Sequence, residues 1–215
     1  VLDLYIQGKL HSDEFYLPGN ISSQFISGLL FALPLLDGDS KIHMTSPLQS
    51  KGYIDLTLQM LKQYGIKIEY DEQTFYIKGN QEYQAHDYTI EGDFSQAAFY
   101  LVADALKNDV IIKGLNLKSA QGDKVVIDIL EEMGCSFIKK EDGYVIKCDT
   151  LTSVDIDASQ CPDIIPILAL ACANAKGTSR IYNAGRLRIK ECDRLKATVE
   201  VLKELGIEAI EKEDE

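Results

Sequence analysis

Apolar and polar positions follow the same order of spacings three times along the chain. A strand-like segment precedes an apolar helix, a short strand, an amphipathic helix and two further strands. Each second helix ends at a glycine, which adopts left-handed backbone angles without steric cost. These are Gly65, Gly134 and Gly206, at intervals of 69 residues (65 to 134) and 72 residues (134 to 206). The pattern predicts an α/β (α+β) fold with three β-α-β-α-β-β units.

The expected elements occupy equivalent places in the three copies. First strands are expected at residues 13–19, 87–92 and 153–158, and first helices at 25–36, 97–106 and 164–175. Second strands are expected at residues 40–44, 109–113 and 178–182. The clearest hairpin joins residues 136–140 to 144–147 through Glu141-Asp142-Gly143. Residues 1–8 are similar to the last strand of a copy, and residues 208–211 to an unfinished hairpin, so we expect a piece of a longer protein.

Composition excludes several classes of protein. A net charge of −12 argues against a general nucleic-acid binder. No apolar run approaches the ~20 residues that a membrane helix needs. The five cysteines form no Cys-x-x-Cys pair and the three histidines lie in unrelated contexts. We therefore expect free thiols in a reducing cytoplasm, no metal site, and neither nucleic acid nor membrane as a partner.

Polar clusters stand at the expected helix starts, where backbone N–H groups and the helix dipole favour anions. Ser22-Ser23-Gln24 offers two hydroxyls and an amide in one turn. Simple capping by Ser22 is the alternative, and this cluster alone favours it. Ser50-Lys51-Gly52-Tyr53 makes the same offer at another helix start, with Gly52 permitting close approach of a ligand.

The densest charged cluster is Arg188-Ile189-Lys190-Glu191-Cys192-Asp193-Arg194. We expect it to open a helix, with Lys190 and Arg194 on one face and Glu191 able to pair with Arg194. An anionic ligand would compensate two cations at a helix start, but so would Glu191 and Asp193 in a surface ion-pair network. Arg194 suits bidentate anion binding, and Lys190 with Glu191 is a possible acid–base pair.

Asp163 follows Pro162 at the start of an otherwise apolar helix, where a carboxylate is ordinary. If the helix starts converge, Asp163 faces Lys190 across one cleft and can act as a base or as a hydroxyl acceptor. Cys192 lies among acids and bases, but a spectator role is the favoured interpretation.

These motifs resemble the 5-enolpyruvylshikimate-3-phosphate synthase family in order and spacing. The matching segments are residues 19–25, 50–55, 91–93, 121–123, 162–163 and 188–195. Lys190-Glu191-Cys192-Asp193-Arg194 is specific to that family, and Ser22-Ser23-Gln24 supports it independently. The resemblance extends along the whole chain.

The resemblance implies transfer of the enolpyruvyl group of phosphoenolpyruvate to the 5-hydroxyl of shikimate 3-phosphate, with release of phosphate. It implies that the enzyme uses no metal or organic cofactor and that the parent protein is a monomer. It also implies that the parent protein is the target of the herbicide glyphosate. It also implies two domains of repeated units that close over both substrates. Residues 1–86 would be the last part of the N-terminal-type domain, and residues 87–215 the first two repeats of the C-terminal-type domain.

The same resemblance assigns substrate-binding residues. Ser22, Ser23 and Ser50 would hold the phosphate of shikimate 3-phosphate. Gln24 would reach phosphoenolpyruvate, and Tyr53 would pack near the shikimate ring.

It also assigns residues to the chemical step. Asp163 would accept the hydroxyl protons of shikimate. Lys190 would contact the same hydroxyl side and assist proton transfer. Glu191 would deliver or remove the proton at the methylene carbon, and Arg194 would bind phosphoenolpyruvate.

The chain departs from the family pattern at Arg186, where the family often has Asn, although Asn183 is nearby. The family's substrate-gripping basic residues before Val1 and after Glu215 are not part of this chain. Two alternatives remain: an enolpyruvyl transferase acting on UDP-N-acetylglucosamine, and a folded, non-catalytic fragment. The first of these alternatives is not expected to contain the motif found here at residues 188–194.

Overall fold

The computed structural model describes Asp3 and residues 5–215, and the chain folds into two compact units. The first comprises the described residues of Val1–Gln49 together with Ile54–Asp87. The second comprises Tyr88–Glu215 and the short segment Ser50–Tyr53. Each unit has its own apolar core. The assignment of these parts to two domains of a larger protein stays a prediction.

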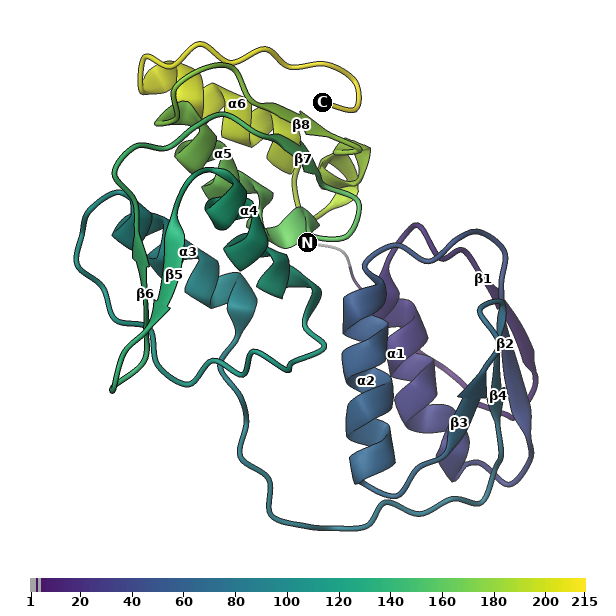
Figure 1. Cartoon of the computed structure of the whole chain (residues 1–215). Helices are drawn as coiled ribbons and strands as arrows, with labels where there is room; N and C mark the ends of the chain where they lie inside the picture. The colour runs from purple at the N-terminus through teal and green to yellow at the C-terminus, as the bar shows by residue number, and fades with distance from the viewer. Residues whose placement is uncertain (1–2, 4) are drawn as a thin grey trace. The chain divides into compact units, whose positions relative to one another are not determined.

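The first unit contains one complete β-α-β-α-β-β repeat. Its elements are β1 (Glu14–Leu17), α1 (Ser23–Ala32), the 3₁₀ turn η1 (Leu33–Leu35), β2 (Ser40–Met44), α2 (Lys51–Gln63), β3 (Ile68–Tyr70) and β4 (Thr74–Ile77). The sheet order is β1-β2-β4-β3, with β1 parallel to β2 and the other pairs antiparallel. The two helices cover one face of this sheet (Figure 1). The predicted element order is confirmed here.

The core of the first unit lies between helices and sheet because apolar residues follow the period of each element. Ile26 and Leu30 are buried one turn apart on α1. On β4, Phe75 and Ile77 are buried while Tyr76 between them is exposed. Pro34 turns the expected single helix at 25–36 into an α-helix followed by a 3₁₀ turn, since proline cannot donate an interior helix bond.

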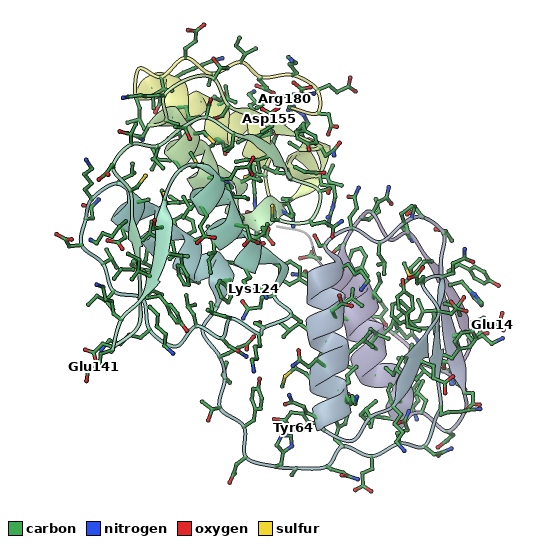
Figure 2. The ribbon with its side chains drawn as sticks, in the orientation of Figure 1. Glu14, Tyr64, Lys124, Glu141, Asp155 and Arg180 are labelled. Carbon is green, nitrogen blue, oxygen red and sulfur yellow. The ribbon has the colours of Figure 1, made fainter. Side chains whose placement is uncertain are left out.

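The second unit contains two repeats in which several of the expected strands are missing. Its elements are α3 (Phe94–Ala105), η2 (Gly122–Val125), α4 (Val126–Glu132), β5 (Ser136–Lys139), β6 (Tyr144–Lys147), β7 (Asp155–Asp157), η3 (Pro162–Ile164), α5 (Ile165–Ala173), β8 (Arg180–Tyr182), η4 (Gly185–Ile189) and α6 (Arg194–Glu204). The predicted hairpin is confirmed as β5 paired antiparallel with β6, and Glu141 marks its tip in Figure 2. β7 and β8 are parallel.

The strands expected at residues 87–92 and 109–113 do not form. One backbone bond joins Gly92 to Gly114, and one bridge pairs Ile112 with Tyr144. The ladder ends there because Val110 and Ile146, the next antiparallel pair, donate their N–H groups to the buried carboxylate of Asp104 at 3.0 and 2.6 Å. A side chain thus replaces the ladder, an alternative that hydrophobic alternation does not reveal.

The two terminal strands are also absent from the described chain. Residues 208–211 are not a strand. Neither are Asp3 and residues 5–8, while residues 1, 2 and 4 of the expected first strand lie outside the described residues.

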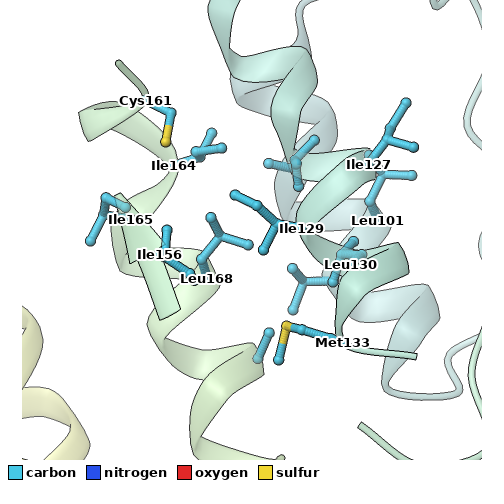
Figure 3. Close-up of a cluster of buried hydrophobic side chains, with 14 of the residues drawn as sticks. Leu101, Ile127, Ile129, Leu130, Met133, Ile156, Cys161, Ile164, Ile165 and Leu168 are labelled. Atoms are coloured by element: carbon cyan, nitrogen blue, oxygen red, sulfur yellow. The ribbon is translucent and has the colours of Figure 1, made fainter. Parts of the chain in front are cut away.

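Apolar faces of α3, α4, α5 and β7 form the core of the second unit (Figure 3). Leu101, Leu130, Leu168 and Ile156 meet there, and each is at most 2% exposed. Full burial of such a side chain contributes about 1.5–3 kcal/mol, so this cluster fixes α4 and α5, which directly follow the η2 and η3 turns that carry Asp123 and Asp163. Within Asp3 and residues 5–215, no helix has the length and apolar character needed to span a membrane. All five cysteines are free thiols, as predicted.

Candidate active site

Asp163 is the centre of a polar cluster in the second unit. Pro162 supplies the fixed backbone angle of the first position of η3, which places Asp163 in the first turn. Its Oδ1 accepts hydrogen bonds from Lys190 Nζ at 3.2 Å and Arg194 Nη1 at 2.7 Å. Its Oδ2 accepts one from the hydroxyl of Tyr53 at 3.0 Å. The predicted approach of Asp163 to Lys190 is therefore confirmed.

Lys190 and Glu191 reach the cluster by a different route from the one expected. Both precede α6, which begins at Arg194, and Lys190 has an extended backbone. Asp193 caps the helix by accepting the N–H of Lys196 at 3.0 Å. The expectation that Lys190 and Arg194 share a helix face is wrong. Asp193 is the N-cap of α6, so the helix begins after Lys190. They converge on Asp163 nonetheless.

The expected pairing of Glu191 with Arg194 is confirmed, and the ion pair is bidentate. Arg194 Nε and Nη2 each donate to a different carboxylate oxygen of Glu191 at 2.7 Å. These bonds lower the pKa of Glu191, whose side chain is 65% exposed. Three of the five N–H groups of Arg194 are used in its bonds to Glu191 and Asp163, so its planar fork retains donors for an anion.

Arg188 belongs to a separate ion-pair network. It contacts Asp193 at 2.9 Å and Glu211 at 2.8 Å, and donates to the backbone oxygens of Lys212 and Glu213. The surface-network interpretation of the charged run is therefore confirmed for Arg188, whereas Lys190 and Arg194 turn to Asp163.

The start of α2 supplies the other side of the cluster. Ser50 has a left-handed backbone (φ 53°), uncommon for a residue with a side chain, and its Oγ accepts from Arg186 Nη1 at 2.9 Å. Gly52 does allow a close approach, but of the chain itself. A Cβ atom there would lie 2.6 Å from the nitrogen of Gly122. The small residue thus seats the Ser50–Tyr53 segment against η2, which differs from the expected ligand contact.

Ser22, Ser23 and Gln24 lie in the first unit at the N-terminus of α1. Ser22 is the N-cap, and its Oγ accepts the N–H of Gln24 at 3.3 Å. The capping interpretation is confirmed for Ser22. Ser23 is buried and Gln24 exposed in the first turn.

The sequence analysis did not assign two residues of the cluster, Asp123 and Ser95. The hydroxyl of Tyr53 lies 3.0 Å from Oδ2 of Asp123, and Oγ of Ser95 lies 2.5 Å from the same oxygen. The available signal was the repeat, since Asp123 belongs to the polar cluster Gln121-Gly122-Asp123, whose Gly122 takes the repeat position of Ser50. In Asp3 and residues 5–215, no three His, Cys, Asp or Glu side chains are grouped to share a metal ion.

Lower pH is expected to destabilise the fold through Asp163. Burial alone would raise its pKa, but the charge of Lys190 and hydrogen bonds from Arg194, Tyr53 and Lys190 lower it below the ordinary 3.8. The ionised carboxylate therefore stabilises the fold above about pH 4, and this contribution is lost as pH falls through the native pKa. We expect the difference in unfolding free energy between wild type and Asp163→Asn to shrink below about pH 4 in urea titrations. A difference independent of pH would contradict this assignment.

The repeated units and their sheet topology are those of the enolpyruvyl transferase fold. The chain belongs to the EPSP synthase (3-phosphoshikimate 1-carboxyvinyltransferase) family, whose model matches residues 1–215. It is 55% identical to the 3-phosphoshikimate 1-carboxyvinyltransferase of Clostridium beijerinckii, over 100% of this chain and 50% of that protein. It is 56% identical to that of Clostridium botulinum strain Eklund 17B, over 99% and 50%.

A solved EPSP synthase from Acinetobacter baumannii is similar in structure. Its TM-score is 0.76 at 25% identity, over 96% of this chain and 48% of that one. The chain spans about half the length of the curated relatives it matches.

Proposed function

We propose that the protein to which this chain belongs transfers the enolpyruvyl group of phosphoenolpyruvate to the 5-hydroxyl of shikimate 3-phosphate. Phosphate is the second product, and the reaction takes place in the cytoplasm with a monomeric enzyme. The observation that carries the proposal is the Asp163 carboxylate held by both Lys190 and Arg194, in a chain of the EPSP synthase family. This arrangement combines a proton acceptor with two cations, which suits a reaction between anionic substrates.

In the chemical step, Asp163 accepts the proton of the attacking hydroxyl, and Lys190 assists that transfer from the same side. The depressed pKa of Asp163 keeps it ionised at neutral pH, which a hydroxyl acceptor requires. Glu191 delivers or removes the proton at the methylene carbon. Arg194, whose fork retains N–H donors, binds phosphoenolpyruvate and holds Glu191 in place.

The phosphate of shikimate 3-phosphate is assigned to Ser22, Ser23 and Ser50. Ser22 and Ser23 are at a helix N-terminus, where backbone N–H groups favour anions. Ser50 already contacts the guanidinium of Arg186, which supports an anion at that position. Gln24 is assigned to phosphoenolpyruvate, and Tyr53 to packing near the shikimate ring.

The decisive assay offers phosphoenolpyruvate to the full-length protein with either shikimate 3-phosphate or UDP-N-acetylglucosamine. We expect enolpyruvyl product and phosphate release with shikimate 3-phosphate alone. Turnover only with UDP-N-acetylglucosamine would replace the proposal with the sister activity. Inhibition by glyphosate in the first reaction is a further expected result.

The 215-residue chain by itself is proposed to be non-catalytic, because it spans half the length of its relatives. Calorimetric titration of this chain with shikimate 3-phosphate, beside Lys190→Ala, tests how much of the site it contains. Binding that is lost in the variant would mean that the cluster around Asp163 forms a binding site unaided. Turnover by this chain alone would overturn the proposal.

A further inference from the structure

Tyr53 places a single hydroxyl proton between two carboxylates. Its oxygen lies 3.0 Å from Oδ2 of Asp123 and 3.0 Å from Oδ2 of Asp163. A phenol can donate one hydrogen bond. If both carboxylates were ionised, one of these two contacts would bring oxygen lone pairs together without a proton. The geometry is satisfied when one of the two acids is protonated and donates to Tyr53.

The environments of the two acids decide which one holds that proton. Asp163 contacts the ammonium of Lys190 and the guanidinium of Arg194, and both cations favour its ionised form. Asp123 is 1% exposed, and the neutral hydroxyl groups of Ser95 and Tyr53 form hydrogen bonds with its Oδ2. Its other oxygen, Oδ1, is buried with no hydrogen-bond partner among the described residues. An isolated buried carboxylate of this kind favours the neutral form.

The two charged groups that face Asp123, Asp93 and Asp163, both favour its neutral form. The titratable groups that face it are Asp93 at the start of α3, Tyr53 at the start of α2, and Asp163 and Cys161 at η3. Burial, followed by the charges of Asp163 and Asp93, raises the pKa of Asp123, although bonds from Ser95 and Tyr53 oppose the shift. Burial also raises the pKa of the Cys161 thiol to about 12, so that this neighbour is neutral.

We propose that Asp123 holds a proton at neutral pH and positions Asp163 through Tyr53. The hydrogen bonds then run in one direction: Asp123 donates from Oδ2 to the Tyr53 oxygen, and Tyr53 donates to Oδ2 of Asp163. Ser95 donates to Asp123. Asp123 is a positioning residue, since its contact with Asp163 passes through Tyr53. This inference rests on the proposed function for its consequence in catalysis, but not for the protonation state.

The consequence is a fixed orientation of the proton acceptor. With Asp123 neutral, the Tyr53 proton anchors one oxygen of Asp163, while Lys190 and Arg194 hold the other. When Asp123 ionises at higher pH, it competes for the Tyr53 proton and adds a negative charge to a buried site. Asp163 then loses an anchor, and turnover falls.

The test compares Asp123→Asn with Asp123→Ala in the full-length protein. An asparagine nitrogen at the Oδ2 position donates to Tyr53 as the protonated acid does, whereas alanine cannot. We expect kcat/KM of Asp123→Asn to stay within about 5-fold of wild type at pH 7, and that of Asp123→Ala to fall about 5- to 150-fold, the range for losing one buried hydrogen-bond partner. The wild-type decline in kcat at alkaline pH should be reduced in Asp123→Asn. Equal losses in both variants with unchanged pH profiles would overturn the proposal.

Infrared spectroscopy separates this inference from the proposed function. At pH 7 the wild-type protein should show a carboxylic-acid C=O band that is absent from Asp123→Asn, whatever its substrate proves to be. The absence of such a band would overturn the inference even if the enzyme were active. Conversely, the presence of the band without turnover of shikimate 3-phosphate would contradict the proposed function but support the protonation of Asp123.

A double-mutant cycle tests the path through Tyr53. In a Tyr53→Phe background, Asp123→Ala should cost less in kcat/KM than it does in wild type, because the intermediary hydroxyl is already gone. Full additivity of the two losses would show that Asp123 does not act through Tyr53.

Discussion

Lys190→Ala is expected to lower kcat/KM of the full-length protein by about 10²- to 10⁴-fold, the range that a positioned acid–base group contributes. The substitution removes the ammonium that lies 3.2 Å from Oδ1 of Asp163. Asp163 then keeps Arg194 as a partner but loses one of the two cations that lower its pKa. Proton transfer therefore becomes slower, and the ionised form of Asp163 becomes less favoured. Steady-state kinetics with each substrate varied in turn measures the effect.

Lys190→Arg distinguishes charge from proton transfer. Arginine retains the positive charge but does not release a proton near neutral pH. We expect this variant to recover substrate binding while kcat remains low. Recovery of kcat to the wild-type value would show that Lys190 acts by charge alone.

Lys196→Ala is the matched control in the same segment. Its ammonium is exposed and pairs with Glu200 at 3.8 Å, a contact of little energetic value. Its kinetics should match those of wild type. A comparable loss in this variant would attribute the Lys190 effect to the general charge of the region.

The sequence was sufficient to predict the repeat architecture because glycine stop signals and apolar periods recur in each copy. It was not sufficient to show that the strands expected at residues 87–92 and 109–113 do not form. The N–H groups of Val110 and Ile146 bind Asp104 instead of completing a ladder. Such competition between a side chain and a strand depends on three-dimensional placement, which an alternating pattern does not record.

The polar cluster was predicted in part for a similar reason. Asp163, Lys190 and Arg194 stood out because charge at helix starts is visible in a sequence. The partnership of Tyr53 with Asp123 spans 70 positions and emerges only when the Ser50–Tyr53 segment packs onto η2. The charge pattern also predicted that Lys190 lies within a helix, because it did not identify Asp193 as the N-cap of α6.

Leu130→Ala is expected to lower the unfolding free energy of the chain by about 2–5 kcal/mol, the cost of truncating a fully buried leucine. Leu130 on α4 is 0% exposed and lies in the cluster that contains Leu101 and Met133 (Figure 3). Alanine removes the apolar contacts of the side chain and leaves a cavity between packed helices. Urea unfolding followed by circular dichroism measures the loss.

The same core should tolerate a change of shape that conserves volume. Leu130→Met is expected to cost less than about 1.5 kcal/mol, because the thioether refills the space. Val201→Ala on α6, where the side chain is 54% exposed, should change stability by no more than about 0.5 kcal/mol. If the loss of stability in Leu130→Ala were as small as in Val201→Ala, the α3–α4 contact would not be a packed core. A large loss confined to Leu130→Ala would show that this apolar contact stabilises the unit that carries Asp123 and Asp163.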